Sequence, residues 1–476
     1  MKNRSLDIRA LPALCLTLAL GACTTVGPDY RLPDKAAINA PTARGAFVGA
    51  AYTEHADGAL PDQWWRMYDD AQLNRLVEEA LAANADLRVA TANLSRSEAI
   101  VQEAEGAKHI KAGASATAVR AREAGEAYII PHALPVENLA NAGIRLSYQI
   151  DLVGGLKRAA EAAEADAEAS RAALDLARVS IAADVAQAYA EACSAGHEQA
   201  VAEQAADLQQ KNLDAVTRLV AAGRGMAADV PRADALVAMT RSAIPAHIAR
   251  RRVALYRLAV LTGHPPADYP RQLETCSHVP HPNQPIPLGD GTALLRRRPD
   301  VRQAERSLAA ATARVGVATA ALYPTVTLGL SAGATGLLDH MGQAGTRRWS
   351  FGPLISWTIP GDEEKARVRQ ADAGAEAALA RFDAVVLRAL QEIESDLALL
   401  ARDLDRNSAL RRARDDTSDA ARQVRAQFAG GRLPYLDDLN AQRALTEAEA
   451  ALAASDAQVA TDQIRVFLAL GGGWER

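Results

Sequence analysis

The sequence predicts a mainly α-helical protein that carries a small number of membrane-crossing β-strands. Three observations predict this fold class. Alanine makes up roughly a fifth of the chain, and aromatic residues make up only 4% of its 476 residues, which favours helices packed closely through small side chains. Several motifs recur in the same order in both halves of the chain. Two segments alternate apolar and polar residues with the period of a strand.

Composition and charge exclude two classes of protein. Hydrophobic residues are 49% of the chain, charged residues are 23%, and the formal net charge is -5. A disordered acidic tail would be less hydrophobic, and a basic nucleic-acid-binding protein would carry a positive net charge. We therefore expect a folded protein with a large core and no nucleic-acid partner.

The N-terminus predicts export. Lys2, Arg4 and Arg9 precede an apolar run from Ala10 to Leu20. A run of about 11 residues is too short to cross a bilayer as a helix and is typical of a signal-peptide core. We assign residues 1–22 to a signal peptide.

The residues that end this segment resemble a bacterial lipobox, Leu20-Gly21-Ala22-Cys23. In a lipobox the cysteine becomes the first residue of the mature protein and carries lipid, so we expect Cys23 to be acylated and residues 23–62 to form a lipidated N-terminal extension. Thr24 follows where an acidic residue could stand, which in such lipoproteins implies release to the outer membrane. The alternative is an ordinary small-residue cleavage site next to an incidental cysteine.

Two cysteines remain in the mature chain after Cys15 leaves with the signal and Cys23 takes the lipid. They are Cys193 and Cys276, and two distant cysteines do not define a disulfide framework, so their pairing stays open. No other apolar stretch reaches about 18 residues, so any membrane span in the mature chain is expected to be a β-strand.

The repeated motifs divide the chain into two similar halves. Asp86-Leu87-Arg88 recurs as Asp300-Val301-Arg302, Ser147-Tyr148 recurs as Ser356-Trp357, and Gly223-Arg224 recurs as Gly431-Arg432. Alanine-rich low complexity would not keep Gly, Arg and Asp in register. The first repeat, 63–262, is expected to hold a helix, strands 110–121 and 142–152, a long helix 155–222 and a helix 228–262. A Pro-rich linker, 263–290, leads to the second repeat, 291–476, with a helix, strands 325–334 and 349–359, a long helix 362–429 and a helix 435–470.

Each predicted strand has about the length that a tilted membrane strand requires. Tyr148, Trp349 and Trp357 would supply aromatic side chains at the membrane interface. The alternative is a small soluble hairpin on a helical protein. Four strands cannot close on themselves, and an open edge in lipid would leave backbone groups without partners. The strands must therefore be shared between two, three or four copies.

Several motifs together resemble those of TolC-like outer membrane factors, and in particular the NodT-type lipoproteins that serve resistance-nodulation-division efflux systems. They are Val26-Gly27-Pro28-Asp29-Tyr30, Trp64-Trp65, Arg297-Arg298-Pro299-Asp300-Val301-Arg302, Tyr323-Pro324 and Gln442-Arg443. The resemblance implies a homotrimer in which four strands per chain form one shared 12-stranded barrel in outer membrane lipid. A tunnel of long helices would continue it into the periplasm.

The resemblance also implies the function. A protein of this family is a passive exit duct for drugs or other small toxic compounds, works with a periplasmic adaptor protein and an inner-membrane pump, and is not an enzyme. Two alternatives remain: a type I secretion duct for proteins, and a periplasmic coiled-coil scaffold without a pore. We expect no cofactor and no metal. Cys276, His278 and His281 have metal-like spacing but lack a fourth ligand.

The family places its adaptor contacts at two helix turns and its gate just inside them. The turns correspond here to Gly223, Arg224 and Gly225, and to Gly430, Gly431 and Arg432. In the run from Tyr435 to Arg443, Leu436 would form an apolar ring with Arg443 nearby. The family commonly has an aspartate where this chain has Asn440, and Asp437, Asp438 or Asp229 could supply negative charge instead. Acidic residues early in a helix also complement its dipole without any role in a gate.

Overall fold

The computed structural model describes residues 25–52, 55–56, 58 and 60–472. The predicted signal peptide and Cys23 lie outside these residues. The chain forms two compact units, and each draws segments from both halves of the sequence. The sheet unit comprises the described parts of Met1–Pro33, Leu94–Ser170 and Ala304–Phe382. The helical unit comprises the described parts of Asp34–Asn93, Arg171–Gln303 and Asp383–Arg476.

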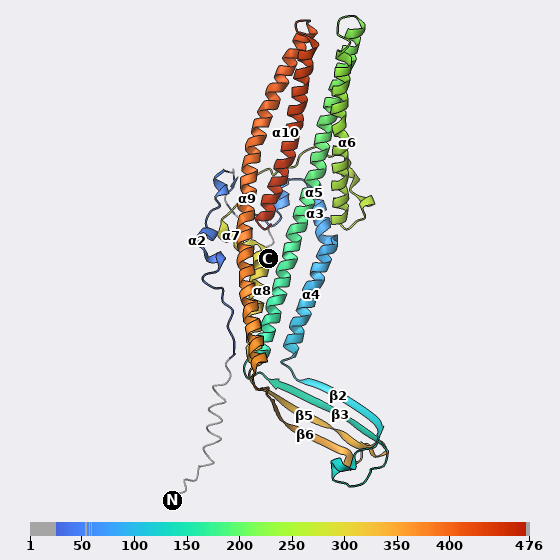
Figure 1. Ribbon diagram of the computed structural model, residues 1–476, viewed down its shortest axis with the longest axis vertical. Coiled ribbons are helices and arrows are strands. Elements are labelled where there is room, and N and C mark those ends of the chain that lie inside the picture. The colour runs from blue at the N-terminus through green and yellow to red at the C-terminus, as the bar shows by residue number, and fades with distance from the viewer. Residues whose placement is uncertain (1–24, 53–54, 57, 59, 473–476) are drawn as a thin grey trace. The chain divides into compact units, whose positions relative to one another are not determined.

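The sheet unit contains four antiparallel strands in the order β2-β3-β5-β6 (Figure 1). They are β2 (Lys111–Ala121), β3 (Glu137–Ile150), β5 (Thr325–Leu337) and β6 (Arg347–Ser356). The central pair, β3 and β5, joins one strand from each half of the sequence. Within the described residues, the outer edges of β2 and β6 pair with no further strand.

Three of the predicted strands have clearly different limits in the structure. β3 begins at Glu137 instead of residue 142, because its first residues pair with the end of β2 although they do not alternate in polarity. β6 covers 347–356 instead of 349–359, so Trp357 lies beyond its end. Its partner β5 starts at Thr325, directly after Pro324, which has no amide hydrogen to extend the ladder. β5 also continues to Leu337, past the predicted end at residue 334.

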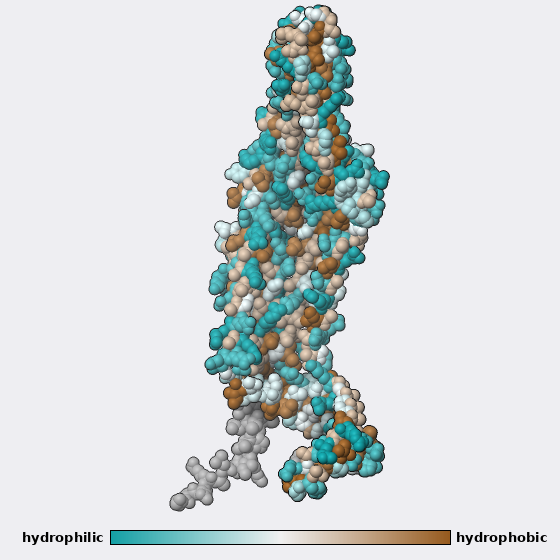
Figure 2. Space-filling model, turned by 45° about the vertical axis from the view of Figure 1, so that its right-hand side comes forward, coloured by the Kyte–Doolittle hydropathy of each residue, from teal (hydrophilic) through white to brown (hydrophobic). Residues whose placement is uncertain are grey.

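The strand register gathers apolar side chains on one face of the sheet. Across β3, β5 and β6, residues that lie opposite one another form four rows: Ile144 with Ala332 and Trp349, Leu146 with Leu330 and Phe351, Tyr148 with Leu328 and Pro353, and Ile150 with Val326 and Ile355. The intervening rows carry residues such as Arg145, Ser331 and Ser350 on the other face, because successive side chains of a strand alternate. Many of the large apolar side chains are exposed, and Figure 2 shows apolar residues at the surface of this sheet.

The helices follow the same order around the strands in both halves. In the first half, α4 (Ala85–Gly106) precedes the strands, and α5 (Gly155–Ala221) and α6 (Asp229–Leu261) follow them. In the second half, α8 (Pro299–Ala320) precedes the strands, and α9 (Asp362–Ala429) and α10 (Tyr435–Ala469) follow them. The observed ends of α5, α6, α9 and α10 lie within one residue of the predicted ends. The shorter helices of the helical unit are α2 (Pro41–Arg44), α3 (Ala71–Ala83) and α7 (Gly291–Arg297), and a small parallel pair joins β1 (His55–Ala56) to β4 (Ile286–Pro287).

The long helices α5 and α9 pack through different kinds of side chain. In α5 the stretch 182–195 is buried on almost every face, mostly through alanine. In α9, Phe382, Val386, Ile393 and Leu397 are fully buried and lie four or seven residues apart, as expected for a helix seam. None of the described helices combines the length and the apolar character that a membrane crossing requires.

A pair of stacked rings and a helix cap each connect separate elements of the helical unit. Trp64 stacks on Phe467 of α10 with ring centroids 4.6 Å apart, and both side chains are buried. Asp70 begins α3 by accepting hydrogen bonds from the amides of Gln72 and Leu73 at 2.8 Å and 3.1 Å. The same carboxylate accepts a hydrogen bond from Tyr189 of α5, so this cap also ties α3 to α5.

Cys193 and Cys276 form a disulfide, which answers the question that the sequence left open. The bond ties the Pro-rich linker to α5 within the helical unit. Gly196 makes this approach possible, because a Cβ atom there would lie 1.9 Å from the carbonyl oxygen of Cys276. His278 lies beside the two sulfur atoms, but a disulfide provides no thiolate to hold a metal.

An acidic pair lies between α9 and α10 in the helical unit. Asp462 on α10 is buried, accepts a hydrogen bond from Gln458 at 2.9 Å and lies 3.5 Å from Arg465. Burial, together with the neighbouring Asp403 carboxyl on α9, raises the pKa of Asp462 from 3.8 to about 6. The folded state therefore favours the protonated form, and the contribution of this group to stability is lost as the pH rises from about 4 to about 6.

We expect Asp462→Asn to raise the melting temperature more at pH 7 than at pH 4, because the amide carries no charge to bury. Full conversion of the pKa difference gives ~3 kcal/mol, which solvent screening reduces to about 1–2 kcal/mol at pH 7. Thermal unfolding of the detergent-solubilised protein at several pH values measures the effect. Asp405→Asn, at an exposed position on α9, is the control and should change little. Equal shifts at pH 4 and pH 7 would contradict the assignment.

Candidate gate and tip

Two helix hairpins form the candidate tip within the helical unit. One joins α5 to α6 and the other joins α9 to α10, and both helices α5 and α9 end in the same way. Gly223 and Gly431 have φ values of 74° and 71°, which favour glycine. The next amides, of Arg224 and Arg432, donate to carbonyls five residues earlier at 2.9 Å, as in a Schellman cap. This shared ending explains why a glycine recurs at the same place in both halves.

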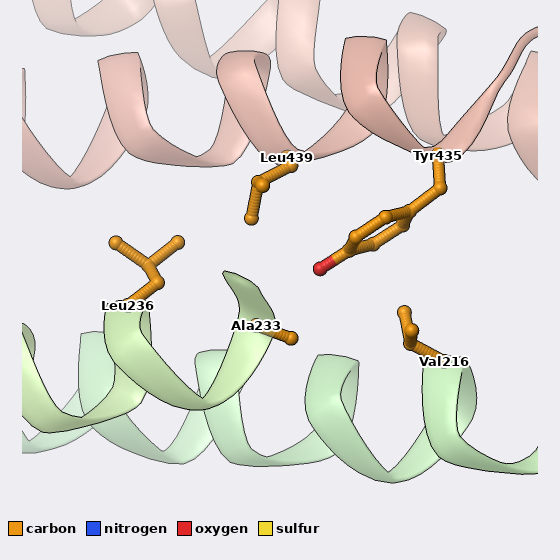
Figure 3. Packing of buried hydrophobic residues seen from close by; sticks show 5 residues of the cluster. All are labelled: Val216, Ala233, Leu236, Tyr435 and Leu439. Carbon is orange, nitrogen blue, oxygen red and sulfur yellow. The ribbon is translucent and has the colours of Figure 1, made fainter. Parts of the chain in front are cut away.

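A small apolar core holds the two hairpins together. Val216 of α5, Ala233 and Leu236 of α6, and Tyr435 and Leu439 of α10 are buried against one another (Figure 3). A cavity of about 740 Å³ lies between the ends of the hairpins and is lined by both turns and by Leu436. The tip therefore combines a packed apolar cluster with a cavity between the helix turns.

Buried polar side chains form a second layer of contacts in the tip. Asn212 of α5 donates a hydrogen bond to the Tyr435 hydroxyl at 3.3 Å, and Gln209 donates to Thr446 of α10 at 3.5 Å. Arg425 of α9 lies 3.4 Å from the Asp438 carboxylate. Burial raises the pKa of Tyr435 to about 12, with the Asp438 charge as a second cause. Burial also raises the pKa of Asp438, and the Arg425 charge opposes that rise.

Sequence reasoning missed Gln209, Asn212 and Arg425. A signal was present, because Gln209, Asn212, Val216 and Val220 step by threes and fours along α5. That spacing is typical of a helix seam, and its polar members mark positions where a buried seam needs hydrogen-bond partners.

Two of the predicted gate acids are buried, which corrects the expectation that they present charge near an entrance. Asp229 is 5% exposed, accepts a hydrogen bond from the Met226 amide at 3.0 Å and lies 3.4 Å from Arg232, so it stabilises the start of α6. Asp438 is fully buried beside Arg425. Asp229 therefore acts in helix structure, which was the alternative to a gate role, and Asp438 forms part of the buried packing of the tip.

The other candidate gate residues share an exposed surface of α10. Leu436 is 47% exposed, and Asp437, Asn440 and Arg443 are also exposed. Leu436, Asn440 and Arg443 are spaced by four and three residues, so they lie on one face of the helix. The buried face carries Tyr435, Leu439 and Gln442. The structure thus brings Leu436, Asn440 and Arg443 together and separates them from Asp438.

The predicted interface aromatics all lie in the sheet unit. Trp349 and Tyr148 are exposed on the apolar face of the sheet, on β6 and β3. Trp357 lies just past β6 and donates a hydrogen bond from Nε1 to the Leu322 carbonyl at 3.1 Å. Trp357 therefore marks the end of the strand next to the helices of this unit.

The same family of proteins matches each half of the chain. Outer membrane efflux proteins match residues 76–264 and again residues 292–472. The chain is 30% identical over 465 residues to nodulation protein T of Rhizobium leguminosarum bv. viciae, covering 98% of this chain and 93% of the relative. It is 28% identical over 481 residues to the antibiotic efflux pump outer membrane protein ArpC of Pseudomonas putida, covering 98% and 96%.

Solved structures agree with these relatives. The outer-membrane channel OprN superposes with a TM-score of 0.88 at 32% identity, covering 94% of this chain and 99% of that chain. VceC from Vibrio cholerae superposes with a TM-score of 0.80 at 25% identity, covering 88% and 100%. The family match spans most of both halves, and the fold agrees over nearly the whole chain. The protein therefore belongs to the outer membrane efflux protein family.

Proposed function

We propose that this protein is the outer membrane exit duct of a tripartite efflux system. In this proposal drugs or other small toxic compounds leave through it passively, and a pump in the inner membrane supplies the energy. Three identical chains form the duct, a periplasmic adaptor protein contacts its tip, and a lipid on Cys23 anchors each chain. ArpC, a relative named for antibiotic efflux, supports small molecules as the cargo.

The observation that carries the proposal is the uncovered apolar face of the sheet. Its rows of Ile144, Leu330, Phe351 and Ile355 are aligned across three strands and exposed in the isolated chain. A contiguous exposed apolar surface of this kind marks a membrane or protein interaction site. Exposed Trp349 and Tyr148 suit the boundary between lipid and water, where aromatic side chains are enriched.

Unpaired strand edges and exposed helix residues support an assembly of several copies. Backbone groups at the edges of β2 and β6 need partners if the sheet lies in lipid. On α6, Met239, Val253 and Val260 are exposed at intervals of seven or fourteen residues, which is the spacing of a helix seam that awaits a neighbour. Leu387 and Leu399 of α9 are exposed as well. The family resemblance supplies the number three.

The tip supports a gate and an adaptor contact. Leu436 lines the cavity between the tip turns, and three copies of this side chain would form an apolar ring that excludes water and ions when closed. Asn440 and Arg443 on the same face of α10 would continue the lining with polar groups. The turns at Gly223–Gly225 and Gly430–Arg432 are exposed and would face the adaptor.

The purified mature protein should conduct ions when it is reconstituted into planar lipid bilayers, because a duct is a continuous water-filled path. Addition of the adaptor protein should raise the conductance by opening the tip. A non-channel scaffold would give no conductance under either condition, and that result would contradict the proposal. Deletion of the gene should sensitise cells to drugs or dyes, whereas loss of a secreted protein alone would favour the secretion duct.

Leu436→Ala should loosen the closed state, because the smaller side chain leaves a wider apolar constriction. We expect a higher resting conductance of single channels and greater sensitivity of cells to antibiotics that are normally too large to enter. Leu468→Ala is the matched control, since Leu468 is on the same helix, similarly exposed and far from the tip. A Leu436→Ala channel that behaves like the Leu468→Ala channel would exclude Leu436 from the gate.

A further inference from the structure

A buried arginine in the sheet unit holds the first described residues of the chain. The side chain of Arg158, in the first turn of α5, is only 5% exposed. Its Nε donates to the Val26 carbonyl at 3.1 Å, and its Nη2 donates to the Gly27 carbonyl at 3.3 Å and to Asp29 at 2.7 Å. Its Nη1 donates to Glu161 at 2.7 Å. Only arginine offers enough donors in one plane for all four acceptors.

Close backbone packing locks the same segment in place. Gly27 has a φ of +80°, and a Cβ atom there would lie 2.4 Å from the Cα of Gly316 on α8. A Cβ on Gly316 would in turn lie 2.7 Å from the Arg158 side chain. The Val26 amide donates to the Val153 carbonyl at 2.9 Å, just after β3 ends at Ile150. We call this arrangement of Val26, Gly27, Asp29, Arg158 and Gly316 the N-terminal latch.

Contacts along α8 extend the latch. The Tyr30 hydroxyl donates to Glu305 at 3.2 Å, and the Arg306 guanidinium lies 5.7 Å from the centre of the Tyr30 ring. Arg306 also pairs with Glu305 at 2.7 Å and with Glu168 of α5 at 3.2 Å. The segment from Val26 to Tyr30 is therefore fixed against both helices that flank the strand ends.

Among the residues that the structure describes, the latch has no counterpart in the second half, although the helices around it are repeated. α5 begins at Gly155 and α9 begins at Asp362, so Lys365 lies as far from the start of α9 as Arg158 lies from the start of α5. Lys365 is exposed, in contrast to Arg158. Because only one of the two equivalent helices has a buried arginine near its start, we assign this arginine the role of holding the N-terminal segment.

We infer that the N-terminal latch sets the depth at which the lipid anchor enters the membrane. Val26, the first residue of the latch, is three residues from Cys23, so the anchored residue can lie no more than about 11 Å from it. The latch sits where β3 passes into α5, so the acyl chain would enter the leaflet beside that end of the strands. Anchor and sheet would then meet the same lipid surface. This inference rests on the proposed acylation of Cys23 and on the proposed membrane insertion of the sheet.

Spin labelling tests the latch directly. A Pro28→Cys variant of the full-length mature protein, reconstituted in phospholipid vesicles, carries a nitroxide label at an exposed position inside the latched segment. We expect an immobilised spectrum in the otherwise unchanged protein. Arg158→Met should abolish the immobilised component, and Lys365→Met should preserve it. Gly27→Ala should also abolish it by clashing with Gly316, which gives a second variant if Arg158→Met fails to fold. An immobilised spectrum in both Arg158→Met and Gly27→Ala would overturn the latch.

Two further measurements test the positioning role of the latch and the acylation of Cys23 independently. Power saturation with oxygen and with a water-soluble nickel complex should place labels at residues 28 and 157 at the same depth in the latched protein. The depth at residue 28 should shift in Gly27→Ala. Unequal depths in the latched protein would overturn the positioning role. An N-terminal peptide without lipid, seen by mass spectrometry, would instead remove the anchor and with it the proposed acylation, while the immobilised spectrum would be unaffected.

Discussion

The unpaired edges of the four-stranded sheet are the constraint on which the structure of this protein depends. A strand edge exposes a row of amide and carbonyl groups, and in hydrocarbon each group without a partner costs several kcal/mol. Within the part of the chain that the structure describes, β2 and β6 have such edges, and the face between them exposes large apolar side chains that are unfavourable in water. The proposed solution is that identical chains complete the sheet, and this solution makes the assembly a requirement of folding in the membrane.

The helical unit depends on a different property, which is the close packing of its long helices. Alanine covers most faces of α5 in the stretch 182–195, so neighbouring helices can approach on several sides. Individual contacts then hold the segments that have no counterpart in the other half of the chain. The disulfide holds the Pro-rich linker on α5, and the stacked rings of Trp64 and Phe467 hold the N-terminal segment on α10. The N-terminal latch does the same for the first described residues in the sheet unit.

Features with a short-range periodic signal could be predicted from the sequence. The ends of α5, α6, α9 and α10 follow from glycine turns and from the absence of proline in α5 and α9, and strands β3 and β6 follow from the alternation in Ile144–Ile150 and Trp349–Ile355. The length of β3 could not be predicted, because its first residues are held by pairing with β2 and not by their own pattern. The match of one family to both halves supports the duplication that the repeated motifs indicated.

Features that depend on a contact between distant segments escaped prediction. Asp229 and Asp438 look like exposed acids at the start of a helix, but both are buried in the folded tip, Asp438 beside Arg425 of the neighbouring helix α9. Pairing of Cys193 with Cys276 depends on the path of the linker, which no local pattern encodes. Arg158 resembled any other charged residue early in a helix until the chain placed Val26, Gly27 and Asp29 around it.

Cross-linking of the two outer strands tests the central claim most directly. Ser115 in β2 and Ser350 in β6 lie on the same face of the sheet. Within one chain their strands are three spacings apart, at least about 14 Å, whereas a shared sheet would place the same two strands of neighbouring copies about 5 Å apart. A protein with cysteines at both positions, treated in membranes with a bismaleimide whose reach is shorter than about 10 Å, should give a ladder that ends at three chains. Single chains alone, or a ladder that ends at two, would contradict the account.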